Sequence, residues 1–142
     1  MSERHFQMRL QGNYQEPENS VASLRVEIFA GEEWQVFDLN SGSAGFLIFV
    51  YAVLNCQHTH LRLNCAERGM LLDTAEGYIH MTTTEEWTLS DLRVEFTGKL
   101  RSGMPTQDDI DYIIDRMENC PVSRNLKYQA SGHTRLVLVP AG

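Results

Sequence analysis

The sequence lacks an apolar stretch long enough to cross a bilayer. Its longest uncharged, mainly apolar stretch runs from Ala44 to Leu54, far short of the roughly 20 residues that a spanning helix needs. The first residues, Met1 to His5, are not followed by an apolar run, so we expect no secretory signal peptide. These features favour a soluble, cytoplasmic protein that does not act at a membrane.

Positive charge is also scarce. The chain has 12 Lys and Arg residues against 19 Asp and Glu residues, a formal net charge of −7. Nucleic acids and anionic lipids need clustered positive charge, so we expect neither as a partner. With 142 residues, of which 42% are hydrophobic, the composition is that of an ordinary globular protein, and we expect a single domain over 1–142.

Motifs for metals and nucleotides are absent. The sequence has no C-x-x-C, no H-E-x-x-H and no glycine-rich phosphate loop. His58 and His60 are two residues apart, about 200° around a helix, so they cannot bind one metal ion together. We therefore expect no metal and no cofactor. The chain has three cysteines, an odd number, and in a reducing cytosol we expect no structural disulfide, which leaves packing, metal or redox chemistry as their role.

Strands are predicted in the first 40 residues. Apolar and polar residues alternate in two segments there, a pattern typical of strands with one buried face. The apolar positions are Phe6, Met8 and Leu10 in the first segment, and Leu24, Val26 and Ile28 in the second.

A long helix is predicted over about 44–68. No Gly or Pro interrupts the chain between Phe46 and Arg68. The first three turns of this helix are apolar on every face, so we expect it to be buried in the middle of a domain or of a dimer.

The rest of the chain predicts strands over about 75–101, helices over about 106–129 and a last strand over about 133–139. Thr106 and Asp109 have the spacing of a capping box at the start of the first of these helices. The order of these elements indicates an α+β fold with antiparallel pairing: strands, a helix, strands, helices and a last strand.

The three cysteines occupy different settings. Cys56 lies among apolar residues of the long helix, and Cys65, nine residues later, points to the opposite face of that helix. Cys120 precedes Pro121, which suits the first position of a helix. Since a helix N-terminus stabilises a thiolate, local chemistry favours Cys120 as the more acidic thiol.

Two segments together resemble the OsmC/Ohr family. One is Tyr51–Cys56 in an apolar helix, followed by Cys-Ala-Glu-Arg-Gly over Cys65–Gly69. The other is an acidic amphipathic helix that leads into Cys-Pro-Val-Ser-Arg at Cys120–Arg124. The two cysteines that the motifs share, Cys56 and Cys120, are 64 residues apart, which is similar to the family's spacing.

The resemblance implies a fold and a chemistry. The implied fold is an α+β domain with antiparallel sheets, in which two chains interlock as a homodimer around long apolar helices. The implied chemistry is thiol-dependent reduction of hydroperoxides in oxidative-stress defence. By this resemblance Cys56 is the peroxidatic residue and Cys120 the resolving one, and a dithiol reductant restores both thiols.

Two alternatives follow from the residues. The family's peroxidases pair the reactive cysteine with an Arg from the N-terminal region and with a Glu about ten residues before the cysteine. In this sequence Phe46 stands ten residues before Cys56, and the segment Gln11–Gln15, where the Arg would lie, holds no Arg. The second hypothesis is therefore a non-enzymatic dimer that binds a small apolar ligand. Phe46, Phe49 and Tyr51 are the residues expected to line the substrate or ligand site under either hypothesis.

The third hypothesis is a thioredoxin-like monothiol enzyme, since Cys120–Ser123 is also a C-P-x-S string. That class places a strand directly before the cysteine. Here the sequence predicts a helix at that place, which disfavours the hypothesis.

Overall fold

Five antiparallel strands form one sheet in the order β3-β2-β1-β4-β5. The computed structural model describes residues 2–127 and 135–136. The strands are β1 (Arg4–Gln15), β2 (Ser20–Ala30), β3 (Glu33–Val36), β4 (Leu71–Thr83) and β5 (Leu89–Ser102). The helices are α1 (Gly45–Glu67), α2 (Gln107–Glu118) and α3 (Pro121–Arg124). The fold is α+β, as the sequence predicts.

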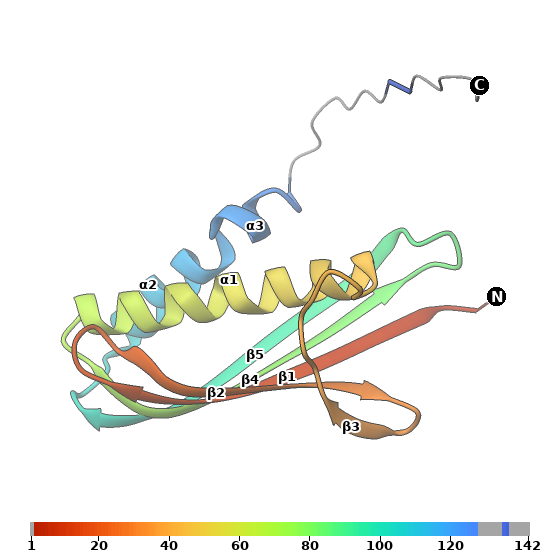
Figure 1. The fold of residues 1–142 in the computed structure, drawn as a ribbon. Helices are drawn as coiled ribbons and strands as arrows, with labels where there is room; N and C mark the ends of the chain where they lie inside the picture. The colour runs from red at the N-terminus through yellow and green to blue at the C-terminus, as the bar shows by residue number, and fades with distance from the viewer. Residues whose placement is uncertain (1, 128–134, 137–142) are drawn as a thin grey trace.

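The helices cover one face of the sheet. Figure 1 shows α1 lying along the strands, with α2 and α3 beside it. Along β1 the side chains of Met8 and Leu10 are buried beneath α1, whereas Arg9 points to the other face, because successive side chains of a strand alternate. No helix among the described residues is long and apolar enough to cross a membrane.

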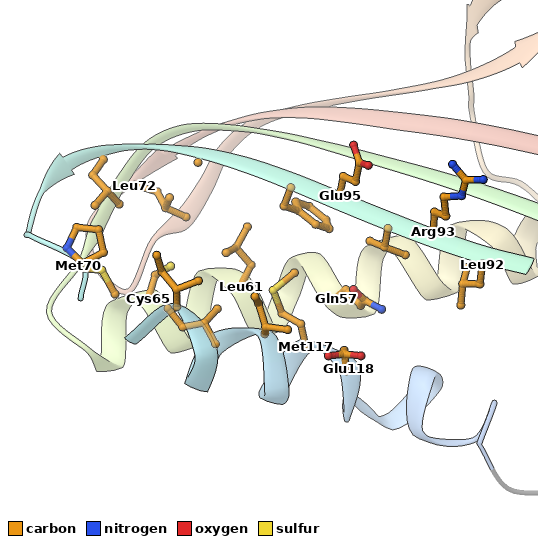
Figure 2. A pocket seen from close by; sticks show the side chains of 18 residues that line it. Gln57, Leu61, Cys65, Met70, Leu72, Leu92, Arg93, Glu95, Met117 and Glu118 are labelled. Atoms are coloured by element: carbon orange, nitrogen blue, oxygen red, sulfur yellow. The ribbon is translucent and has the colours of Figure 1, made fainter. Parts of the chain in front are cut away.

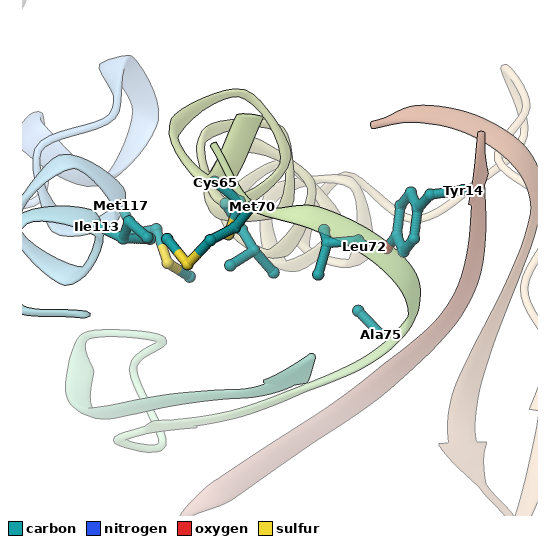
Figure 3. Close-up of a cluster of buried hydrophobic side chains, with 8 residues drawn as sticks. Tyr14, Cys65, Met70, Leu72, Ala75, Ile113 and Met117 are labelled. Atoms are coloured by element: carbon teal, nitrogen blue, oxygen red, sulfur yellow. The ribbon is translucent and has the colours of Figure 1, made fainter. Parts of the chain in front are cut away.

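The core has two parts, one beneath each half of α1. Beneath the first half, Met8, Val53 and Ile79 belong to a cluster of fully buried side chains. Beneath the second half, α2 joins α1 and the sheet, and its residues Ile113 and Met117 pack into the cluster shown in Figure 3. The helices and the sheet thus enclose a continuous apolar layer.

Strands β1 and β4 are longer than the side-chain pattern predicts. Polar Asn13 continues β1 because its backbone pairs with Ser23 on one side and Thr74 on the other. Strand β4 begins at Leu71, before the predicted boundary near residue 75. At its start, the backbone N–H of Leu72 donates a 2.7 Å hydrogen bond to the side chain of Asn19, which lies in the turn between β1 and β2.

Asn19 connects three segments. Its side-chain amide donates to the carbonyl oxygens of Arg62 in α1, at 3.0 Å, and of Met70, at 3.1 Å. Its own backbone has a φ of 54°, in the left-handed region that Asn tolerates better than most residues. This buried amide thus holds the β1–β2 turn, the C-terminal part of α1 and the start of β4 together.

Helix α1 is not buried on every face within one chain. One side packs on the sheet, yet Ile48 is 38% exposed and Leu63 is 43% exposed. Helix α2 begins with the predicted capping box: the Thr106 hydroxyl accepts from the N–H of Asp109, and the Asp109 carboxylate accepts from the N–H of Thr106. The predicted last strand over about 133–139 lies almost entirely outside the described residues.

Candidate functional site

Cys56 and Cys120 lie near each other, and hydrogen bonding to the Cys120 side chain raises the pKa of the Cys56 thiol. Cys56 is in the middle of α1 and half-buried. Cys120 is the N-cap of α3 and 0% exposed. The fold therefore brings together two of the three cysteines, across 64 residues of chain.

The first turn of α3 faces both sulfur atoms. The Cys120 sulfur accepts a 3.4 Å hydrogen bond from the backbone N–H of Ser123. The backbone N–H groups of Val122 and Ser123 also form hydrogen bonds with Cys56. Pro121 stands at the start of the helix, where its missing N–H costs no hydrogen bond.

Burial, followed by hydrogen bonding to Cys120, raises the pKa of Cys56 to about 11, and the negative charge of a Cys120 thiolate acts in the same direction. Hydrogen bonding to the backbone of Val122 and Ser123 acts in the opposite direction. Among the described residues, no cationic side chain lowers this pKa. At neutral pH Cys56 in the single chain is therefore a thiol, consistent with its apolar setting in the sequence.

Cys65 belongs to a different part of the molecule. It is buried in the second core cluster, with Ile113 and Met117 of α2 as fellow members, and Figure 3 shows it at the C-terminal end of α1. Burial also raises the pKa of the Cys65 thiol to about 11. It is a packing residue in this structure.

The aromatic residues at the start of α1 form a ring cluster. The ring centroid of Phe46 is 4.6 Å from that of Phe6, 5.3 Å from that of Trp87 and 5.4 Å from that of Phe49. Tyr51 instead pairs with Phe37, at 6.0 Å. Sequence reasoning missed Trp87, because it stands in the turn between β4 and β5 and has no periodic pattern around it.

A cavity of about 800 Å³ lies between α1, α2 and β5. Figure 2 shows its side chains, with Leu61 and Met117 among the apolar ones and Gln57 and Glu118 at one end. Phe46, Phe49 and Tyr51 are not among the residues that line it. Sequence reasoning could not find this cavity, because its walls come from segments far apart in the chain.

A buried polar pair lies on the sheet side of α1. Tyr14 Oη and His58 Nε2 share a 2.6 Å hydrogen bond, and the His58 ring stacks on Phe96, with centroids 6.1 Å apart. Burial, followed by the charge of Arg62, lowers the pKa of His58 to about 4. Burial raises the pKa of Tyr14 to about 12. Tyr14 and His58 are thus both neutral, and the hydrogen bond between them anchors α1 to β1.

Possible metal ligands do not gather in the described part of the chain. Within residues 2–127 and 135–136, no three His, Cys, Asp or Glu side chains are placed so that they could hold a metal ion. The Cys pair is therefore the chemical centre that the described residues offer.

This α+β fold, a five-stranded sheet covered on one face by a long helix, matches the fold of a solved structure. The chain is similar to the crystal structure of an OsmC-like hydroperoxide resistance protein from Jannaschia sp. CCS1, with a TM-score of 0.65. The similarity covers 94% of this chain and 94% of that chain, at 10% sequence identity. No family model and no curated protein matches the sequence. The fold is OsmC-like, and the resemblance that the sequence motifs carry is confirmed at this level.

Proposed function

We propose that the protein is a thiol-dependent hydroperoxide reductase of the cytoplasm. The observation that carries this proposal is that α3 brings Cys120 close to Cys56: Gln57, the next residue after Cys56, bonds to Ser123, and the N–H of Ser123 donates to Cys120 Sγ. Two thiols within contact can form a disulfide after one of them is oxidised, and this is the chemistry of a peroxidatic and a resolving cysteine.

The difference in exposure between the two cysteines supports one distribution of the two roles. Cys56 is half-buried and so within reach of a substrate, whereas Cys120 is completely buried. A hydroperoxide therefore meets Cys56 first. This argument favours Cys56 as the peroxidatic residue, in agreement with the sequence resemblance and against the helix-terminus argument that favours Cys120.

The proposed reaction oxidises the protein once, forms a disulfide in a second step and reduces it in a third. The Cys56 thiolate attacks the terminal oxygen of the hydroperoxide, an S–O bond forms, the O–O bond breaks, and the alkoxide takes up a proton to leave as an alcohol. The Cys120 thiolate then attacks the Cys56 sulfur, an S–S bond forms, and hydroxide leaves and is protonated to water. A dithiol reductant finally supplies two electrons and two protons and restores both thiols.

A second copy of the chain belongs to the proposal. Ile48 and Leu63 are partly exposed on α1, and a homodimer would cover this side of the helix. Phe46, Phe49 and Tyr51, at the start of α1, are the residues that we propose to contact the apolar part of the substrate. Sedimentation at micromolar concentration should show a dimer. A stable, folded monomer would contradict this part of the proposal.

The test of the activity is peroxide consumption with an excess of dithiol. Cys56→Ser should abolish turnover. In a parallel assay without added dithiol, Cys120→Ser should consume one peroxide per chain and accumulate the sulfenic acid of Cys56, because no second thiol can resolve it. Cys65→Ser is the matched control and should keep wild-type turnover, since Cys65 packs in a separate cluster. Full turnover in Cys56→Ser would overturn the proposal.

A second candidate function is the binding of a small apolar ligand without chemistry. The raised pKa of Cys56 and the cavity of about 800 Å³ favour it, since this volume lies within the range of small-molecule sites. The test is binding of an apolar fluorescent probe to wild type and to Leu61→Trp, which fills the cavity. Probe binding that Leu61→Trp removes, in a protein without peroxide turnover, would favour this candidate.

A further inference from the structure

Gln57 makes a buried hydrogen bond directly beside the cysteine pair. It follows Cys56 in α1, and its side-chain amide Nε2 donates to Ser123 Oγ at 3.1 Å. Gln57 is only 7% exposed and Ser123 only 6%. This bond joins the middle of α1 to α3 across 66 residues of chain.

Ser123 also contacts both sulfur atoms through its backbone. Its N–H donates to Cys120 Sγ at 3.4 Å, and hydrogen bonding to its backbone lowers the pKa of Cys56. Helix α3 has only four residues, so its own hydrogen bonds fix it weakly. The hydrogen bond from Gln57 is therefore an important restraint on the position of this turn.

We propose that Gln57 is a positioning residue that holds Ser123, and with it Cys120, in contact with Cys56. This inference rests on the proposed function, in which Cys56 and Cys120 react with each other. The hydrogen bonds that support the inference do not involve peroxide. A group that is held in place reacts much faster than one that must find its partner. Gln57 is thus expected to accelerate disulfide formation by Cys120 without touching the reacting atoms.

The experiment follows the reaction of the protein with 5,5′-dithiobis(2-nitrobenzoate). In the first phase the half-buried Cys56 attacks the reagent, an S–S bond forms to one thionitrobenzoate, and a second thionitrobenzoate leaves. In the second phase Cys120 attacks the Cys56 sulfur and releases the bound thionitrobenzoate. Stopped-flow absorbance separates the two rates, and the second rate reports the position of Cys120 alone.

Gln57→Leu should slow the second phase roughly tenfold and leave the first phase within twofold of wild type, a size consistent with losing one buried hydrogen bond. Ser123→Ala, which removes one oxygen atom, should have the same effect. The double variant should be no slower than either single variant, because both changes break one interaction.

Asn64→Leu is the matched control. Asn64 is also a buried amide of α1, and its side chain donates to the carbonyl oxygen of His60 in the same helix, at 2.7 Å. This variant should leave the second phase unchanged, even if it lowers the melting temperature. A second phase within twofold of wild type in Gln57→Leu and Ser123→Ala, or one slowed equally in Asn64→Leu, would overturn the inference.

The two proposals fail in different ways. If Gln57→Leu slows the second phase but the wild-type protein does not consume peroxide, Gln57 positions a thiol pair that is not a peroxidase. If peroxide turnover is present and the variants leave the second phase unchanged, the proposed function stands and Gln57 has only a packing role. Should Gln57→Leu not fold, Ser123→Ala decides alone.

Discussion

Tyr14 and His58 share a hydrogen bond of 2.6 Å in the buried layer between β1 and α1. The His58 ring is 1% exposed, and burial lowers its pKa to about 4. His58 is therefore a neutral imidazole in the folded chain, and protonation of its ring favours unfolding.

Acid should therefore destabilise the protein through His58. The unfolded chain binds this proton near pH 6.5, whereas the folded chain binds it only near pH 4. Stability is thus fully present above pH 6.5 and is lost as the pH falls, by about 3 kcal/mol at pH 4. Urea unfolding between pH 7 and pH 4 measures this loss. His58→Gln, which does not titrate, should give a flatter profile, and an unchanged slope in this variant would contradict the assignment.

Alkylation of Cys56 should accelerate with pH over an unusually wide range. Since its pKa is raised to about 11, the thiolate fraction should grow about tenfold per pH unit well beyond pH 8.5, the value of an ordinary thiol. The measurement is the rate of iodoacetamide incorporation at Cys56 by mass spectrometry. A plateau below pH 8.5 would mean that a cation absent from the single chain stabilises the thiolate.

Mild oxidation should join Cys56 to Cys120. Cys56 and Cys120 lie near each other, whereas Cys65 lies in another cluster. Peptide mapping under non-reducing conditions should find the 56–120 cross-link as the main product. The cross-link closes a loop of 64 residues and should raise the free energy of unfolding by about 4 kcal/mol. A main product that contains Cys65 would be evidence against this pairing.

Gly77→Ala should destabilise the fold. A Cβ atom at Gly77 would collide with the ring of Phe96, and this ring stacks on His58. Displacement of a packed ring costs about 1–3 kcal/mol, which thermal unfolding can measure. Gly45→Ala is the control, because nothing lies near its added Cβ. Equal melting temperatures for the two variants would show that the ring moves freely.

Local signals in the sequence predict local structure well. Thr106 and Asp109 form the predicted capping box, because both halves of that motif lie within one turn of the chain. The sequence pattern predicts a start for β4 that is too late, because the first hydrogen bond of this strand is to Asn19, more than 50 residues away. No pattern near Leu72 signals such a partner.

In the candidate site, too, some features can be predicted from the sequence and others cannot. The spacing of Cys56 and Cys120 resembles that of a known family, and this resemblance made the pair visible in the sequence. The hydrogen bond from Gln57 to Ser123 and the cavity beneath α2 depend on how distant segments pack. Neither has a sequence signature, since a lone Gln or Ser in a helix is ordinarily a surface residue.

The hydrogen bonds of the Asn19 amide restrict the insertion of residues into the turn between β1 and β2. Most turns at the edge of a sheet can be lengthened at a small entropic cost. The turn between β1 and β2 must instead deliver Asn19 to the carbonyl oxygens of Arg62 and Met70 and to the N–H of Leu72. Extra residues there would withdraw the amide and break these three hydrogen bonds. Natural variation in loop length should therefore be found at the β4–β5 turn and be rare at the β1–β2 turn.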